Sequence, residues 1–236
     1  SKLPGGKARL LSAWADIEGA KKGHYNWTQS DQVVQMTEEA GLKLIARLDR
    51  SPGWTGAGAP NGPPQRYEDF GDFCYAVASR YKGRIQAYQI WNEPNLVREW
   101  GQVNAAEYVE LLKIAYTRAK EADPECVILA GALSATIELD DTVLGKGIND
   151  FVYLQQMYDA GAAPYFDVMS MQGYGLYSGP TDRRMRPRVL NFSRPLYVRE
   201  IMVQNGDAHK PIFVLAPALA MATAIFAFAV IPFGPT

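Results

Sequence analysis

The chain has 236 residues, of which 47% are hydrophobic and 21% charged, and its 24 basic side chains nearly balance its 25 acidic ones. A net charge of −1 creates no overall field that would favour nucleic acid or an anionic membrane, and the apolar and aromatic content excludes disorder over most of the length. With only two cysteines and two histidines, the sequence argues against a disulfide scaffold, a histidine-rich metal site and a Ser-His-Asp triad, so no metal ion or cofactor is expected.

The chain opens on SKLPGGKARL, which lacks the apolar core of a signal peptide, so we expect no export signal and assign no compartment. Six short apolar runs predict β-strands at residues 9–14, 42–48, 85–91, 127–133, 166–171 and 211–215. Helical periodicity fills most of the gaps between them. Helices are expected over residues 30–40, 70–81, 150–160 and 194–204, and a further one follows Asn104 and Glu107, which are typical of a capping box.

Alternating strands and helices indicate a parallel α/β fold, of which two architectures compete. A doubly wound nucleotide-binding sheet would carry a glycine-rich phosphate loop after its first strand, and the sequence has no such motif. A (β/α)8 TIM barrel instead gathers polar side chains at the C-terminal ends of several strands, and here those ends carry Arg47, Asp49, Asn92, Glu93, Asn95, Gln172 and Tyr174. We therefore expect a TIM-barrel-type domain over residues 1–212, incomplete, with about six strands.

The segment YQIWNEPN, residues 88–95, is the most specific motif in the sequence. An apolar strand runs directly into Asn92, Glu93 and Pro94, and the proline, which has no N–H, ends the strand just after the acid. A carboxyl group on the inner rim of a barrel, next to aromatic side chains, suits a general acid, and the neighbouring amide can donate to a substrate hydroxyl. A surface turn is the alternative.

Two loops carry further candidates. Residues 51–65 follow a strand end and are expected to shape the same face, and Trp54 in this loop could either stack on a sugar or pack in the core. Residues 181–188 carry four arginines, Arg183, Arg184, Arg186 and Arg188, a composition typical of a solvated loop, with contact to an anionic sugar or phosphate as the alternative. No interleaved aromatic residues make this loop a nucleic-acid-binding strip.

The end of the chain differs in composition from the rest. Residues 211–236 contain no charged side chain, and residues 212–231 form an apolar run of about 20 residues, the length that crosses a bilayer core. We therefore predict that residues 213–236 are a hydrophobic tail, a transmembrane or foreign segment, which contacts a membrane or a hydrophobic partner through residues 213–231. A buried strand followed by a buried helix is the alternative.

The motif YQIWNEPN resembles the acid/base strand of clan A retaining glycoside hydrolases, especially bacterial sequences similar to the family 39 xylosidases and the family 5 cellulases. Matching pieces extend over about residues 11–212. The resemblance implies that Glu93 is the acid/base, that Asn92 contacts the sugar 2-hydroxyl, and that Arg47 and Tyr174 flank the nucleophile. Gln172 stands where the family usually has a histidine before the tyrosine, and we include it with Trp54 among the expected substrate-binding residues.

The sequence departs from that family after Ile212. The family continues with a few apolar residues and then a glutamate, the nucleophile, whereas Ala216 stands near that place here and no acidic residue follows. Residues 215–236 resemble instead a membrane helix of the quinone-site subunit of respiratory complex I. The sequence therefore predicts an incomplete barrel joined to a foreign segment, with weak or absent hydrolase activity.

Three functions stay open at this point: an active hydrolase that uses another carboxylate, a non-catalytic carbohydrate-binding relative, and a membrane-associated protein with the barrel as one module. In the first two the ligand is a carbohydrate, and none of the three involves nucleic acid.

Overall fold

The computed structural model describes residues 13–137, 146–175, 179, 181–215 and 229–230. Its centre is a run of five parallel strands that lie side by side in chain order: β1 (Ile45–Leu48), β2 (Ala87–Asn92), β3 (Val127–Ala132), β4 (Met169–Gln172) and β5 (Ile212–Leu215). Two parallel bridges, Leu129 to Val168 and Leu133 to Met171, join β3 to β4, and β6 (Ala229–Val230) pairs with β5 in the antiparallel direction.

Seven α-helices accompany these strands in the described residues: α1 (Trp14–Ile17), α2 (Thr28–Glu39), α3 (Tyr67–Arg80), α4 (Val97–Trp100), α5 (Ala105–Ala122), α6 (Asp150–Asp159) and α7 (Arg194–Gln204). Short 3₁₀ turns lie at Gly53–Thr55 and Ala163–Tyr165. The five helices expected from the sequence are confirmed. The side chain of Asn104 accepts hydrogen bonds from the backbone of Ala106 and Glu107 at 3.0 and 3.3 Å, so it is the N-cap of α5.

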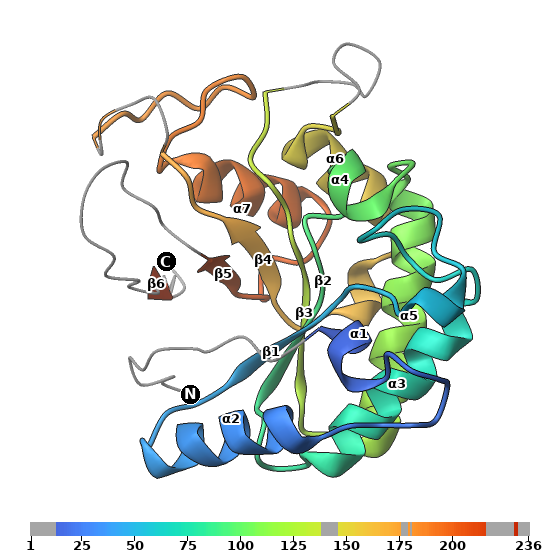
Figure 1. Cartoon of the computed structure of the whole chain (residues 1–236). Helices are drawn as coiled ribbons and strands as arrows, with labels where there is room; N and C mark the ends of the chain where they lie inside the picture. The colour runs from blue at the N-terminus through green and yellow to red at the C-terminus, as the bar shows by residue number, and fades with distance from the viewer. Residues whose placement is uncertain (1–12, 138–145, 176–178, 180, 216–228, 231–236) are drawn as a thin grey trace.

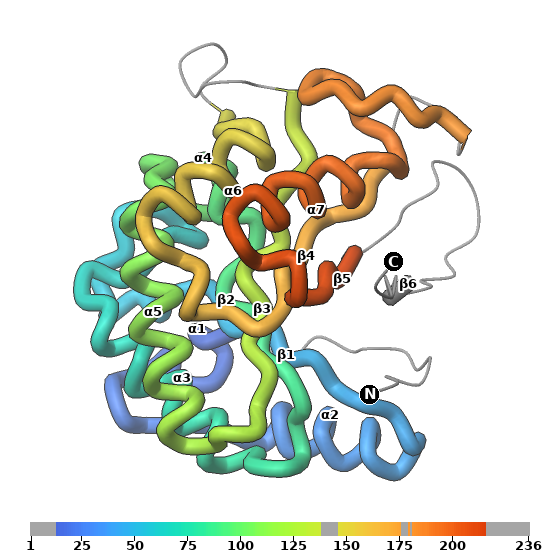
Figure 2. Tube along the Cα trace, turned by 180° about the vertical axis from the view of Figure 1, so that it is seen from behind, coloured from blue at the N-terminus to red at the C-terminus, as the bar shows by residue number. Residues whose placement is uncertain are grey.

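The order of the strands is that of a barrel and not of a doubly wound sheet, because each strand follows its neighbour without a reversal. Figures 1 and 2 show α3, α5 and α6 along one side of the strands. The large core lies between the strands and these helices. On the opposite side of the strands, a smaller cluster contains Ala87, Leu129 and Phe213. The strands are therefore covered by apolar side chains on both faces, as their sequences predict.

The prediction of a strand at residues 9–14 is wrong for residues 13 and 14, the part of this range that the structure describes. Trp14 begins α1, and residues 9–12 lie outside the described part of the chain. The backbone N–H of Trp14 donates to Asp49 at 2.9 Å, so α1 begins at the end of β1. Its indole ring is fully buried and packs against Phe70 and Phe73 of α3. Packing of this ring under a helix therefore outweighs the local pattern that predicted a strand.

The expected membrane helix is wrong for the first residues of the apolar run. Ile212–Leu215 form β5, in register with Met169–Gln172 of β4, so the proposed boundary after residue 212 falls inside a strand. No helix among the described residues is long and apolar enough to cross a membrane. Ala216 and most of the predicted tail, residues 216–228 and 231–236, lie outside the described residues. The apolar character of residues 212–215 follows from burial on β4.

The hydroxyl group of Tyr108 on α5 interrupts the ladder between β2 and β3. Pairing is regular from Ala87 to Ile90 and resumes at Asn92, and Trp91 between them has a positive φ of 68°. The Tyr108 hydroxyl donates to the carbonyl of Ile90 at 3.0 Å and accepts from the N–H of Gly131 at 2.5 Å. A Cβ atom at Gly131 would lie 2.8 Å from the Ile90 carbonyl oxygen, so only glycine fits beside this break in the ladder.

A buried ion pair joins α6 to α7. Arg194 and Asp150 are 3% and 0% exposed, and the guanidinium group donates to both carboxylate oxygens. Arg194 also donates to the carbonyls of Thr136, Pro187 and Val189, which fixes the segments after β3 and before α7. Loss of the carboxylate would therefore leave a buried, uncompensated cation.

We expect Asp150→Ala to lower the free energy of unfolding by about 3–5 kcal/mol, because it leaves the buried Arg194 cation without its counter-charge. The measurement is urea unfolding followed by circular dichroism, with an unchanged denaturant slope. The matched control is Glu38→Gln, which breaks the exposed Glu38–Arg84 pair and should leave the midpoint nearly where it was. Equal midpoints for the Asp150 variant and the wild type would contradict the prediction.

We expect Tyr108→Phe to destabilise the fold by about 2–4 kcal/mol, because it leaves one buried carbonyl and one buried N–H without partners. Tyr153→Phe is a close control: Tyr153 is also fully buried, its ring lies 6.3 Å from that of Tyr108, and its hydroxyl has no hydrogen-bond partner in the described residues. Thermal unfolding of both variants checks the prediction, which fails if the two lose stability equally.

Candidate active site

Glu93 directly follows the C-terminal end of β2, two residues after the break in the ladder at Trp91. Regular alternation would place Trp91 on the same side as Ala87 and Gln89, but its positive φ turns the indole back toward the helices. There it packs against Phe70 and Trp100, with ring centroids 5.5 and 5.6 Å away. Glu93 itself has a positive φ of 43° and is 4% exposed. The strained backbone at both positions therefore determines where this carboxylate lies.

The three non-glycine residues with positive φ in the described chain all follow strand ends or lie within one: Arg50 at 58°, Trp91 and Glu93. Such conformations cost about 1–3 kcal/mol each and persist only where the surrounding structure holds them. At Glu93 the backbone N–H donates to Ala132 of β3 at 3.1 Å, and its carbonyl accepts from Leu96 at 2.9 Å. The strain is therefore concentrated at the rim where the sequence predicts a site.

Arg47 connects the ends of β1 and β2. Its Nε atom lies 2.8 Å from Oδ2 of Asp49, and its Nη1 atom donates to Oδ1 of Asn92 at 3.3 Å. Asp49 is 4% exposed, and burial raises the pKa of its carboxyl although Arg47 opposes that effect. Because Arg47 binds the carbonyl end of the Asn92 amide, the amide nitrogen faces elsewhere, and it has no hydrogen-bond partner in the part of the chain that is described.

The sequence analysis missed Arg98, which is the direct partner of Glu93. Its Nη2 atom lies 2.5 Å from Oε2 of Glu93, and its Nε atom lies 3.2 Å from Glu99. The Arg98 side chain is 70% exposed while that of Glu93 is 5% exposed, so the cation reaches a buried carboxylate from the surface. The hydrogen bond to Glu93 raises the pKa of Arg98. No periodic signal identifies Arg98, because the four-residue helix α4 is too short to show one.

Tyr174 and Gln172 approach the site from the end of β4. Burial raises the pKa of the Tyr174 hydroxyl, and the negative charge of Glu93 raises it further. Gln172 is 8% exposed, and its Oε1 atom has no hydrogen-bond partner within the described residues. An unpaired buried acceptor at a strand end is costly unless a ligand or water binds it.

Trp54 does not join this cluster through any of the contacts described. Its indole N–H donates to the carbonyl of Glu18 at 2.7 Å, and its ring meets that of Trp14 edge to face at 5.7 Å. These are packing contacts, so its sugar-stacking role stays a prediction. Trp100, the other tryptophan after a strand end, is buried against Trp91 and Tyr108.

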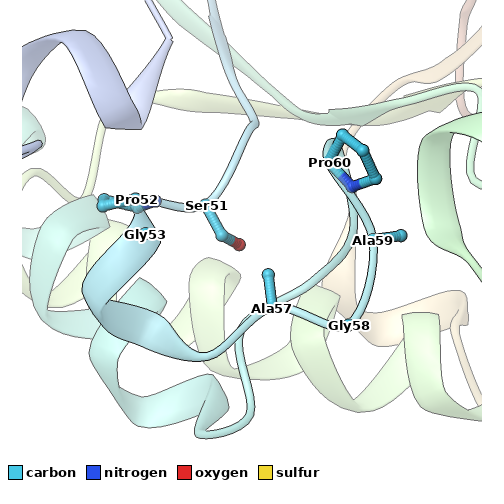
Figure 3. Close-up of a pocket in the computed structure, with 7 residues that line it drawn as sticks. All are labelled: Ser51, Pro52, Gly53, Ala57, Gly58, Ala59 and Pro60. Carbon is cyan, nitrogen blue, oxygen red and sulfur yellow. The ribbon is translucent and has the colours of Figure 1, made fainter.

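The loop at residues 51–65 encloses a small hollow of about 310 Å³, lined by residues 51–53 and 57–60 (Figure 3). Its lining is glycine, proline and alanine apart from Ser51, whose hydroxyl donates to Gly62. The loop touches α4: the amide of Asn61 donates to the carbonyl of Arg98 at 3.4 Å. This loop therefore borders the Glu93–Arg98 pair, as expected from its sequence position, but its hollow offers few groups that could bind a polar ligand.

The described side chains include no cluster of histidine, cysteine or carboxylate groups that could hold a metal ion. The groups gathered at the rim are two buried carboxylates, two guanidinium groups, two amides and a phenol. Such a set can exchange a proton at Glu93 and donate or accept hydrogen bonds around it.

The chain is similar to known β-xylosidases. It is 27% identical to the β-xylosidase of Geobacillus stearothermophilus over 124 residues, which cover 46% of this chain and 25% of that protein. It is 28% identical to the β-xylosidase of Caldicellulosiruptor saccharolyticus over 151 residues, which cover 56% and 31%. The chain thus spans about a quarter to a third of the length of these relatives.

Solved structures show the same fold. A family 39 glycoside hydrolase from Bacteroides cellulosilyticus WH2 superposes with a TM-score of 0.63 at 20% identity, covering 89% of this chain and 42% of that one. A family 39 enzyme from Xanthomonas axonopodis pv. citri gives a TM-score of 0.62 at 15% identity, covering 83% and 41%. At these identities the likeness shows the fold alone, a TIM-barrel-type α/β fold.

The first half of the chain also matches a known protein family. The model of glycosyl hydrolase family 10 matches residues 13–131, half of the chain, which include the motif that ends in Glu93. The expected relation to clan A glycoside hydrolases is therefore confirmed, through a family 10 match and family 39 structural neighbours. By this match over half of its length, the chain belongs to glycosyl hydrolase family 10.

Proposed function

We propose that this chain binds a β-xyloside-type carbohydrate at the C-terminal ends of β1, β2 and β4, with Glu93 as the acid/base of a retaining glycoside hydrolase site. The observation that carries the proposal is the buried carboxylate of Glu93 at the end of β2, held in a strained conformation next to Arg98 and Tyr174. The xyloside is suggested by the names of the relatives, both β-xylosidases.

Hydrogen-bonding groups for a sugar are arranged around Glu93. The Arg47 bond to the carbonyl end of Asn92 leaves the amide N–H group of Asn92 to donate to a sugar hydroxyl. The unpaired Oε1 of Gln172 can accept from a second hydroxyl, which would relieve a buried unsatisfied acceptor. Asp49 holds Arg47 in turn, so the orientation of Asn92 is set before ligand binds.

In a retaining mechanism Glu93 would protonate the leaving oxygen and then remove a proton from the attacking water. Since Arg98 is mostly exposed, its guanidinium can move aside when substrate binds, which leaves the Glu93 carboxyl group free to contact the leaving oxygen. The second carboxylate of such a site lies about 5–5.5 Å from the first and attacks the anomeric carbon.

That second carboxylate is the weak point of the chain as a catalyst. Ala216 stands near the nucleophile's place in the sequence and lies outside the described residues. We therefore propose weak or absent hydrolysis together with sugar binding. The alternative is an active enzyme that uses another carboxylate; Asp49 is a buried carboxylate at the same rim, although it is bound to Arg47.

Removal of the Asn92 amide should weaken sugar binding. We expect Asn92→Ala to lower the affinity for xylobiose about five- to tenfold, because one hydrogen bond worth about 1–1.4 kcal/mol is lost. Isothermal titration calorimetry measures the change. Gln35→Ala on α2, whose amide bonds Glu39, is the control and should bind as the wild type does. If Asn92→Ala and Glu93→Gln both bind xylobiose with the affinity of the wild type, the sugar binds at another place and the prediction is wrong.

The chain should show no Glu93-dependent turnover of aryl β-xylosides, because an alanine cannot attack the anomeric carbon. Loss of one member of a catalytic pair raises the activation free energy by on the order of 4–8 kcal/mol. Added azide should restore slow turnover: azide bonds to the anomeric carbon, the aryl oxygen leaves with the proton of Glu93, and the product is the inverted glycosyl azide. Product configuration is read by nuclear magnetic resonance.

The control for this assay is Glu93→Gln, which should abolish the azide-dependent reaction with a poor leaving group. Rapid hydrolysis with retained configuration, dependent on Glu93 and independent of azide, would contradict the missing nucleophile. In that case Asp49→Asn would show whether Asp49 has taken its place.

A further inference from the structure

The carboxylate of Glu93 has one hydrogen-bond partner within the described residues, and that partner reaches it from the surface. The Nη2 atom of Arg98 donates to Oε2 of Glu93 at 2.5 Å, and no other group in the described part of the chain binds either carboxylate oxygen. The Glu93 side chain is 5% exposed, whereas that of Arg98 is 70% exposed. The guanidinium group therefore covers a buried carboxylate from the solvent side.

The backbones of both residues are held in place, so the flexible part of this pair is the Arg98 side chain. Glu93 is fixed by hydrogen bonds from its own N–H group and to its own carbonyl group. The carbonyl of Arg98 accepts from the amide of Asn61 at 3.4 Å. The N–H group of Val97, directly before Arg98, donates to Lys146 at 2.9 Å. A long and mostly exposed arginine side chain can change its rotamer without disturbing either backbone.

Glu99 provides a second partner, to which Arg98 can stay bound when it leaves Glu93. The Nε atom of Arg98 lies 3.2 Å from Oε1 of Glu99. Release of Glu93 therefore removes one of two ion pairs from the guanidinium group and exposes the group to water, where such pairs are weak. The carboxylate is affected differently, because without Arg98 it has no hydrogen-bond donor among the described residues, and a buried charge without a donor is unstable. A ligand hydroxyl that donates to Glu93 supplies the missing hydrogen bond.

We propose that Arg98 is a latch on the proposed sugar site, which an incoming sugar opens by replacing the guanidinium group on Glu93 with one of its own hydroxyl groups. The inference rests on the proposed function and adds a form of regulation to it, because the strength of the Arg98–Glu93 ion pair then sets the affinity for sugar. The closed and open states differ by this ion pair, and salt screens ion pairs, so salt favours the open state. An uncharged sugar therefore binds more tightly as the salt concentration rises.

The test is calorimetric titration of the full chain with xylobiose, an uncharged ligand, at low and at high salt. We expect the affinity of the wild type to rise about two- to threefold from low to high salt. Arg98→Ala removes the latch, so it should bind about three- to tenfold more tightly than the wild type at low salt and show no dependence on salt. Arg98→Lys keeps the positive charge and should keep the dependence on salt.

Arg84→Ala is the matched control. Arg84 forms an exposed pair with Glu38 and lies before the start of β2, at the opposite end of the strand from Glu93. This variant should keep both the affinity and the salt dependence of the wild type. Circular dichroism checks that Arg98→Ala is folded, and Arg98→Gln, which also removes the charge, takes its place if it is not.

The possible outcomes separate the latch from the proposed function. If the variant without the charge binds xylobiose as the wild type does, or more weakly, the latch is overturned and the proposed function stands. Weaker binding without any effect of salt is the result expected if Arg98 has only a structural role. The latch is also overturned if the wild type binds equally at both salt concentrations, or if the uncharged variant keeps the salt dependence. If neither protein binds xylobiose, the proposed function itself fails.

Discussion

The position of Glu93 depends on the break in the β2–β3 ladder at Trp91, and the hydroxyl group of Tyr108 supplies the hydrogen bonds that this break removes. A parallel ladder that passed straight through Trp91 would leave its large indole on the inner side of the strands. The positive φ at Trp91 moves the ring into the core beside α3 and α4, but it separates the Ile90 carbonyl from its partner on β3. Tyr108 restores both hydrogen bonds from a helix. The cost of strain at the site is thus offset by burial of aromatic rings and by one hydroxyl group.

Charge at the rim is organised by pairing each buried carboxylate with an arginine of different exposure. Asp49 is paired with Arg47, which is mostly buried, and Glu93 with Arg98, which is mostly exposed. In the first pair Arg47 binds both Asp49 and Asn92, so the pair fixes the orientation of the Asn92 amide. It is therefore suited to a fixed hydrogen-bonding role. In the second pair the guanidinium group of Arg98 is open to solvent, so it can be exchanged for solvent or ligand. The Asp150–Arg194 pair, buried on both sides, anchors loops and not ligands.

The arginine-rich loop at residues 181–188 and the Glu93 rim are linked by β4 and the segments around it. The carbonyls that Arg194 and Asn149 bind belong to the chain after β3 and to the arginine loop, and Tyr174 leads from β4 toward the same loop. The buried ion pair between Asp150 and Arg194 therefore also supports the backbone of the exposed loop at residues 181–188.

The sequence by itself determined the order of β1 to β5 and of the five longer helices, the strand that ends in Glu93, and the N-cap at Asn104, because periodicity, capping and the Asn-Glu-Pro turn are local. The resemblance to clan A glycoside hydrolases followed from the same motif. Only the tertiary structure decided that Trp14 begins a helix and that Arg98 meets Glu93. It also decided that Tyr108 bridges two strands. These features depend on contacts between residues that are distant in the sequence or that lie in elements too short to show a period, and such contacts exist only once the chain has folded.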